Sequence, residues 1–331
     1  MIDVREAIRS GAVRPNQKLG QCFLTDPKVA VRIVEAAGLT PGGHVIEAGP
    51  GVCALTGRLC EGAGSVTAVE IDRRLVGVIG RAMSGYGNFR LINADILDVP
   101  AESLLPEPGG RTCAPQPGAI NAHSPVGPCL STQQSAAPLP SSHFRSSSGV
   151  VFVSNLPYYI STPIMTRLFE EFIFVDRAVL MMQKEVSDKL LARPSSPNYG
   201  MLTVFAHYFG TVRKLFSVPP HSFTPQPGVE SAVMLFEAHK PPIEARVPPI
   251  DASAGAPDER IIEKEMFYKT VRASFTSRRK TLVNNLIHAG LAADRSMAED
   301  AVARAGIGAG ARGETLGVHE FVALSRSLTG N

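Results

Sequence analysis

Residues 45–55 read VIEAGPGVCAL, an apolar strand that runs into a glycine-rich turn and then into residues that can begin a helix. Gly49 and Gly51 let the main chain approach a ligand closely, and a helix start offers unpaired amide hydrogens. Glu70 follows Gly49 by 21 positions, where its carboxylate can accept hydrogen bonds from both hydroxyls of a ribose. These features indicate a cofactor that contains a nucleoside. Alone, they also fit the dinucleotide site of a nicotinamide-dependent oxidoreductase.

Short apolar runs alternate with helix-like stretches on both sides of this motif. The first five runs are almost continuous in Val, Ile and Leu, which is typical of parallel strands covered by helices on both faces. We therefore expect an α/β fold with a doubly wound sheet. The predicted strands cover residues 44–48, 65–71, 89–94, 150–154, 178–183, 201–208 and 231–237.

The last seventy or so residues follow a helical period instead. Phe267, Val271 and Phe275 recur at every fourth position, and Leu282 with Leu286 repeats the spacing. We expect a main domain over residues 1–239, a proline-rich linker over 240–258 and a helical domain over 259–331. Residues 106–149 are rich in Pro, Gly and Ser without an apolar period, which predicts a disordered insertion inside the main domain.

Composition excludes several classes of protein. The longest apolar runs are far shorter than the roughly 20 residues of a membrane span, and the first 14 residues resemble neither a secretory signal nor a transit peptide. We therefore expect a cytoplasmic protein that does not bind membranes. The five cysteines form neither a CxxC pair nor a zinc-like cluster, which predicts reduced thiols and no metal. A formal charge of +3 permits a nucleic-acid partner without requiring one.

Residues 93–96 read NADI and end the third predicted strand. An acidic side chain just beyond a strand end of a doubly wound sheet lies in the ligand crevice, where Asp95 could accept a hydrogen bond from an adenine amine. The alternative is that Asp95 only caps the following turn.

Residues 154–163 read SNLPYYISTP and follow the fourth predicted strand directly. The exocyclic amine of adenine is a poor nucleophile because its lone pair is delocalised into the ring. The side-chain oxygen of Asn155 and a main-chain carbonyl held by Pro157 could accept both amine hydrogens and return electron density to the nitrogen. Tyr158 could stack on a base that has left its helix. An ordinary strand-to-helix turn is the alternative for Asn-x-Pro.

Taken in order along the chain, these motifs resemble the KsgA (RsmA) family of ribosomal RNA adenine dimethyltransferases. The resemblance spans nearly the whole chain apart from the insertion and the linker. It is carried by residues 17–24 (QKLGQCFL), 49–55, 69–72 (VEID), 155–158 (NLPY), 160–163 (ISTP), 182–186 (MQKEV), 199–200 (YG), 218–225 and 274–282.

The resemblance implies a Rossmann-like, S-adenosylmethionine-dependent methyltransferase domain followed by a small helical domain. It implies dimethylation of two adjacent adenines near the 3′ end of small-subunit rRNA by a monomer that acts on the assembling subunit. The implied catalytic residues are Asn155, Leu156, Pro157, Tyr158 and Phe223, the last placed to sandwich the target base unless it is a core aromatic. The implied cofactor contacts are Gln21, Cys22, Leu24, Gly49, Gly51, Glu70, Ile71, Asp95, Ile96 and Asn155.

A basic patch is the implied RNA-binding surface. Arg278, Arg279 and Lys280 are consecutive, and on the helix that we expect there they could not all be buried. A solvated helix face is the alternative to contacts with phosphates, which position RNA without reading its sequence. The other members of the expected patch are Lys18, Lys184 and Arg272.

The chain departs from the family pattern at two positions. Cys22 stands where the family usually has Asn at the cofactor, and Cys53 stands where a small residue, Gly or Ala, is typical. Besides the oxidoreductase, two alternatives stay open. One is a large-subunit methyltransferase of the macrolide-resistance type, which shares the Asn-x-Pro-Tyr motif. The other is an assembly or transcription factor that keeps the fold and binds RNA without catalysis.

Overall fold

The computed structural model describes residues 8–11, 13–16, 19–106, 149–172, 174–238 and 259–329, with the side chains of 259–263 excepted. Up to residue 106 its elements are β1 (Phe23–Leu24), α2 (Pro27–Ala37), β2 (His44–Ala48), α3 (Thr56–Gly62), β3 (Ser65–Val69), α4 (Arg73–Met83), β4 (Phe89–Ile92) and the 3-10 helix η2 (Ala101–Leu104). From 149 to 238 they are β5 (Val150–Asn155), η3 (Tyr158–Ile160), α5 (Ser161–Glu170), β6 (Arg177–Gln183), α6 (Lys184–Leu190), α7 (Met201–Phe209), β7 (Gly210–Val218), η4 (Pro220–Ser222), β8 (Phe223–Thr224) and β9 (Ser231–Ala238). From 259 onward they are α8 (Glu259–Ser274), α9 (Leu282–His288), α10 (Arg295–Arg304), η6 (Gly313–Thr315) and α11 (Val318–Thr329).

A seven-stranded sheet in the order β4-β3-β2-β5-β6-β9-β7 forms the centre of the molecule. The first five of these strands are parallel, whereas β9 runs antiparallel to both β6 and β7. The chain builds outward from β2 to β4 and then returns to place β5 on the other side of β2. The doubly wound α/β fold is thus confirmed, with its switch point between β2 and β5.

Six predicted strands are confirmed with small changes at their ends, but the strand predicted over residues 201–208 is wrong. That stretch is α7, whose side chains are buried around nearly the whole helix. A helix that is apolar on all sides is a buried one, and its sequence cannot be told from a buried strand by periodicity. The edge strand β7 was not predicted because Arg213 and Lys214 interrupt its apolar pattern, as charges on edge strands often do.

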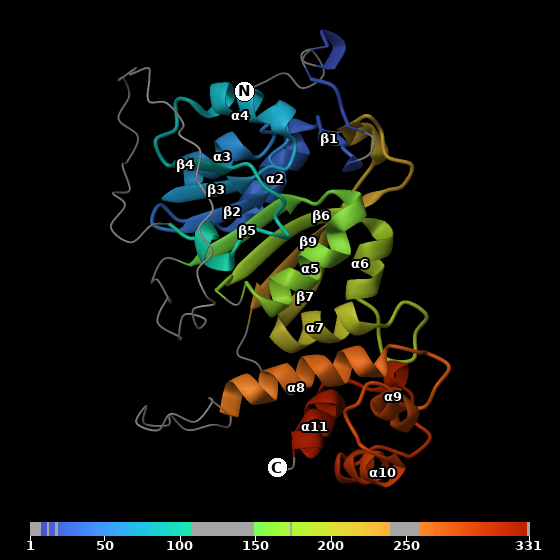
Figure 1. Ribbon diagram of the computed structural model, residues 1–331. Coiled ribbons are helices and arrows are strands. Elements are labelled where there is room, and N and C mark those ends of the chain that lie inside the picture. The colour runs from blue at the N-terminus through green and yellow to red at the C-terminus, as the bar shows by residue number, and fades with distance from the viewer. Residues whose placement is uncertain are drawn as a thin grey trace, which may run out of the picture.

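Helices cover both faces of the sheet (Figure 1). Successive side chains of a strand point to opposite faces, so Val153 packs with the apolar cluster of α2, α3 and α4, and Phe152 packs with that of α5 and α7. The strands are buried on both sides, which explains their continuous apolar sequences.

The C-terminal helices α8 to α11 form one end of the molecule, where α8 and α11 contact α7 (Figure 1), and they share the apolar cluster of α5 and α7. Phe267 stacks on Tyr208 with ring centroids 3.9 Å apart, and the Tyr268 hydroxyl donates to the Phe169 carbonyl at 2.8 Å. Phe275 lies just beyond the end of α8. The continuous core fixes the helical part firmly on the sheet part. Most of the predicted insertion and all of the predicted linker lie outside the described residues.

Two features are absent from the described residues. No helix among them is both long enough and apolar enough to cross a bilayer. No three or more of their His, Cys, Asp and Glu side chains gather as ligands for a metal ion.

Candidate active site

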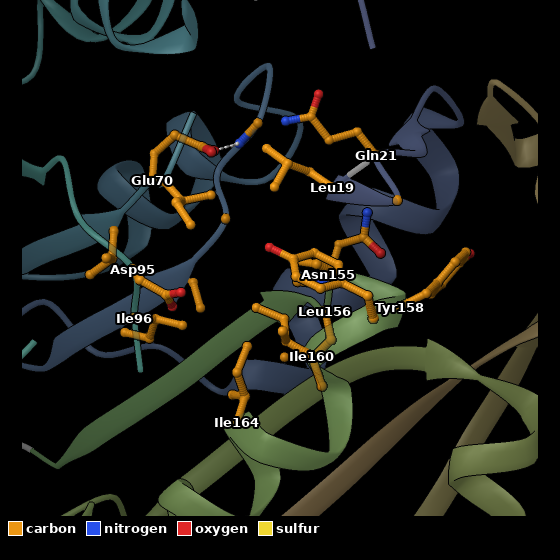
Figure 2. Close-up of a pocket in the computed structure, with 18 of the residues that line it drawn as sticks. Leu19, Gln21, Glu70, Asp95, Ile96, Asn155, Leu156, Tyr158, Ile160 and Ile164 are labelled. Atoms are coloured by element: carbon orange, nitrogen blue, oxygen red, sulfur yellow. Dashed lines mark hydrogen bonds between the residues drawn. The ribbon is translucent and has the colours of Figure 1, made fainter. Parts of the chain in front are cut away.

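A pocket opens at the carboxyl ends of the parallel strands, beside the switch point, where doubly wound sheets bind their ligands. Figure 2 shows Glu70 and Asp95 on one side of it and Asn155 and Tyr158 on the other. The lining residues are Leu19 to Phe23, Ala48, Gly49, Gly51, Val69, Glu70, Ile71, Ala94, Asp95, Ile96, Asn155 to Ile160 and Ile164.

The glycine turn after β2 forms the floor of the pocket. Gly49 and Gly51 both have positive φ, at 68° and 57°, which side chains disfavour. A Cβ on Gly51 would also lie 3.2 Å from the ring of Phe23. Cys53 has a φ of 63°, a backbone conformation that glycine adopts more readily than a residue with a side chain. The turn therefore brings bare main chain to the ligand position.

The carboxylate of Glu70 is oriented by main-chain donors. Its Oε2 accepts from the Gly51 N–H at 3.1 Å, and its Oε1 accepts from the Asp72 N–H at 2.9 Å. Burial raises the pKa of Glu70, while these two donors oppose the rise by stabilising the charged form. Each oxygen has a further lone pair, so the side chain can still accept hydrogen bonds from two ligand hydroxyls.

Two acidic neighbours of Glu70 have opposite electrostatic behaviour. Complete burial, with the charge of Glu70 nearby, raises the pKa of Glu47 to about 8, so Glu47 is mostly neutral at pH 7. Hydrogen bonds from Arg74 hold the pKa of Asp72 below its usual value. Asp72 also accepts from the Gln21 side chain at 3.1 Å, which fixes the N-terminal segment over the pocket.

Asp95 both caps a turn and faces the pocket. Its Oδ1 accepts from the Leu97 N–H at 2.9 Å, and its carbonyl accepts from the Asp98 N–H at 2.9 Å. The carboxylate also lines the cavity opposite Asn155 (Figure 2). The two functions that the sequence suggested for Asp95 are thus compatible, because Oδ2 has no hydrogen-bond partner among the described residues.

The orientation of Asn155 is set by the N-terminal segment. Its Nδ2 donates to the main-chain carbonyl of Cys22 at 3.3 Å, which leaves Oδ1 as an acceptor. The carbonyl of Pro157 is occupied by the Ile160 N–H and by the Ser161 hydroxyl. Within the described residues no hydrogen bond uses the carbonyl of Leu156, so this group is the second available acceptor.

Two consecutive tyrosines at this turn behave differently. The Tyr158 hydroxyl lies 2.9 Å from Ser231 Oγ, and this hydrogen bond fixes the ring beside Asn155. Tyr159 is 46% exposed and lies at the pocket mouth, where its ring is 3.7 Å from the Cβ position of Gly20. Tyr158 therefore offers a rigid face for stacking, and Tyr159 is an exposed aromatic that the sequence analysis missed.

All but two of the predicted catalytic and cofactor-contact residues line this pocket. Leu24 and Phe223 face each other across the β1–β8 pair and are buried in the core, with Phe223 only 1% exposed. This conformation agrees with the alternative that Phe223 is a core aromatic rather than a base-stacking one. Phe23, the residue before Leu24, lines the pocket in its place.

The basic triplet does not lie on a helix, which corrects the sequence prediction. Residues 278–280 form a turn between α8 and α9. Arg278 donates to the carbonyls of Pro197 and Tyr199 at 3.0 and 2.9 Å and forms an ion pair with Glu314 at 3.1 Å. Arg278 thereby ties the α6–α7 connection to the C-terminal helices. The turn forms because Ser274 and Ser277 carbonyls are capped by the buried Asn285 amide.

The other basic candidates differ in whether their side chains already have a partner within the protein. Arg279 and Lys280 are exposed and have no side-chain partner among the described residues. Nη2 of Arg272 donates to both carboxylate oxygens of Glu170, at 2.5 and 2.6 Å, and Lys184 pairs with Asp188 at 2.9 Å. Lys18 lies outside the described residues.

Comparison with known proteins identifies related sequences. The sequence model of the family described as ribosomal RNA adenine dimethylase matches residues 12–249. A ribosomal RNA small subunit methyltransferase A from Bacillus cytotoxicus is 35% identical over 315 residues, which cover 94% of this chain and 90% of the relative. The protein of that name from Bacillus cereus gives the same values.

Two solved structures share the fold. A dimethyladenosine transferase from Plasmodium falciparum superposes with a TM-score of 0.62 and 20% identity, over 91% of this chain and 95% of that one. The 23S rRNA methyltransferase ErmE superposes with a TM-score of 0.55 and 24% identity, over 93% of this chain and 99% of that one. At these identities the two structures support the architecture alone.

Proposed function

This chain belongs to the ribosomal RNA adenine dimethylase family, and from that membership we propose that it dimethylates the N6 amines of two adjacent adenines in small-subunit rRNA, with S-adenosylmethionine as methyl donor. One observation carries the proposal. The acidic residues suited to a nucleoside, Glu70 and Asp95, line the same pocket as the amide and carbonyl acceptors at Asn155 and Leu156.

The pocket residues fit this cofactor. The carboxylate of Glu70 suits the two ribose hydroxyls, and Asp95 across the pocket suits the adenine amine. The positive φ of Gly49 and Gly51 leaves a main-chain cradle that side chains would fill. S-adenosylmethionine supplies an electrophilic methyl group on a positively charged sulfur, which is released as a neutral thioether.

The residues of this chain would activate the target amine by accepting its hydrogens. With Nδ2 of Asn155 donating to the Cys22 carbonyl, Oδ1 can accept one amine hydrogen and the Leu156 carbonyl the other. In the first transfer both bonds strengthen as the nitrogen becomes pyramidal and positively charged, so they favour the transition state over the bound substrate. The nitrogen then loses one proton to solvent, so the singly methylated amine keeps one hydrogen and uses one of the two acceptors in the second transfer. Cys22 contributes through its main chain, so the missing family Asn at this position leaves this contact intact.

The target base would be held by stacking. A base has to leave its helix to reach a pocket at the sheet edge, and an aromatic face compensates for the broken base stack by about 1–3 kcal/mol. Tyr158 offers that face because its hydroxyl is anchored to Ser231, so its ring loses little freedom when a base binds.

Labelled methyl donor tests this proposal directly. The protein is incubated with small subunits that lack the modification, and in parallel with naked large-subunit rRNA, and the label is then mapped on the RNA. We expect two adjacent dimethylated adenines in the small-subunit RNA alone. Label confined to large-subunit rRNA would instead assign the chain to the macrolide-resistance type, and no label would contradict methyl transfer.

A further inference from the structure

The loop that carries Asp95 has little regular structure of its own. It connects β4 to η2, and its residues 93–99 include Asp95 and Ile96, both at the cofactor pocket. The Asn93 side chain donates to the Glu70 carbonyl at 2.6 Å and holds the beginning of the loop against β3. The later part, from Ile96 to Val99, needs a separate support.

Arg167 provides that support from α5. Its Nη1 donates to the Ile96 carbonyl and its Nη2 donates to the Val99 carbonyl at 2.6 Å. Its Nε donates to Glu171 at 2.7 Å, and its guanidinium lies 5.1 Å from the ring centre of Phe172. The side chain is only 11% exposed, so water cannot easily replace it at either carbonyl.

The same helix contacts the catalytic turn at its other end. Ser161, the first residue of α5, donates from its hydroxyl to the Pro157 carbonyl at 3.0 Å. Six residues later, about 9 Å along a helix of ordinary rise, Arg167 binds the Asp95 loop. One short rigid element therefore spans the two sides of the pocket.

We propose that Arg167 is a positioning residue that sets the separation between the Asp95 loop and the Asn155–Tyr158 turn, and through it the fit of the cofactor's adenine. The inference rests on the proposed function, because it assumes that Asp95 receives the nucleoside. Arg167 itself is not among the residues that line the cofactor pocket. A planar guanidinium can reach two carbonyls at once, whereas the single ammonium of lysine cannot hold the same geometry.

Arg90, on β4, offers a matched control because it binds the far end of the same connecting segment. Its Nη2 donates to the carbonyls of Ser103 and Leu105, at 2.5 and 3.0 Å. These carbonyls belong to the η2 end of the segment, and neither residue lines the pocket. Loss of Arg90 should therefore remove similar hydrogen bonds without moving Asp95.

The experiment compares Arg167→Lys with Arg90→Lys in the full chain. Melting temperature and the Kd of S-adenosylhomocysteine are measured by calorimetry, and KM and kcat for methylation follow. We expect both variants to melt several degrees lower. Only Arg167→Lys should raise the Kd and the cofactor KM, by about tenfold for one poorly made hydrogen bond, with kcat at saturation within about twofold.

Two outcomes would overturn the proposal. If both variants lose the same thermal stability and neither changes the Kd, Arg167 is a structural residue only. The same conclusion follows if the Kd rises equally in both variants. If the unmodified protein itself fails to bind S-adenosylhomocysteine, the proposed function fails, and this result is distinct from an effect confined to Arg167.

Discussion

The pocket at the sheet edge and the basic turn between α8 and α9 were both predicted as functional regions, but their side chains are used differently. In the pocket, Glu70 and Asn155 are oriented by main-chain groups and retain free acceptors. In the turn, Arg278 directs its donors to two carbonyls and Glu314, whereas Arg279 beside it has no partner among the described residues. A polar side chain thus remains available for ligand binding where its own hydrogen bonds leave a further acceptor or donor unused. Consecutive charged residues can therefore differ in function, as Arg278 and Arg279 do.

The largest expected effect belongs to the pocket. Asn155→Ala should lower the single-turnover methylation rate by roughly 10²-fold, because one preorganised acceptor of the amine is removed from the transition state. RNA affinity should barely change, since phosphate contacts elsewhere dominate it. The measurement is a single-turnover assay at saturating cofactor and RNA beside direct RNA binding. A normal rate at saturation would show that Asn155 only assembles the complex.

The next largest effect is expected in the turn between α8 and α9, where a substitution should change the stability of the fold. Arg278→Leu should lower the free energy of unfolding by about 1–2 kcal/mol, because two carbonyls lose a donor and Glu314 loses its partner. Arg279→Leu is the matched control and should stay within about 0.5 kcal/mol of the parent. Urea unfolding of both variants measures the difference. Equal stability of the two would remove the structural assignment of Arg278.

For RNA binding we expect the opposite order, with a larger effect from the exposed Arg279 and Lys280 than from Arg278. Replacing Arg279 and Lys280 together by Gln should flatten the salt dependence of rRNA binding by about 0.7–0.9 log-log units for each phosphate that the variant no longer neutralises. Fold and melting temperature should be unaffected because both side chains are exposed. An unchanged slope, measured over a salt titration, would identify the turn as a solvated surface.

The sequence predicted most of the fold and the site residues that belong to short sequence motifs. Parallel strands are buried on both faces, so their sequences are visibly apolar, and the strand over residues 44–48 was predicted to the residue. The glycine turn and residues 155–158 are short motifs that can be recognised from the sequence alone, although the contacts of Asn155 with Cys22 and of Tyr158 with Ser231 span 133 and 73 residues. The prediction failed at α7, where burial on all sides removes the helical period.

The rest depends on contacts far apart in the chain. Arg167 meets Val99 across 68 residues, and Arg278 meets Tyr199 across 79, so neither assignment has a local signal. The core position of Phe223 follows from its pairing with β1. Tyr159 could have been found, because a second aromatic immediately after Asn-x-Pro-Tyr lies at the same pocket.

The smallest expected effect lies at the amino ends of the parallel strands, opposite the pocket. His44 Nδ1 is 2.7 Å from Ser65 Oγ, and its Nε2 is 2.8 Å from the Leu104 carbonyl. The neutral ring makes both hydrogen bonds when its hydrogen is on Nε2, because Nε2 then donates to the carbonyl and Nδ1 accepts from the hydroxyl. Burial lowers the pKa of His44 below 6.5. The unfolded chain therefore binds this proton first as pH falls, and folding stability decreases below about pH 6.5.

A His44→Gln variant isolates that contribution. Its free energy of unfolding should fall less steeply than that of the parent between about pH 6.5 and 5.5, in matched urea titrations. Cofactor affinity should not follow the same curve, because His44 is absent from the pocket lining. Parallel slopes for the two proteins would show that His44 titrates alike in the folded and unfolded chains.

Calorimetric titration with S-adenosylmethionine tests the central claim, that the strand-edge pocket is the methyl-donor site. The parent protein should bind one equivalent. Glu70→Gln should raise the Kd by roughly 10- to 100-fold, since a charged acceptor of the ribose hydroxyls is worth about 1.5–3 kcal/mol. The same change at the exposed Glu61, on α3, should leave the Kd unaltered. The account would be contradicted if the parent protein did not bind S-adenosylmethionine, or if Glu70→Gln bound it with the same affinity as the parent.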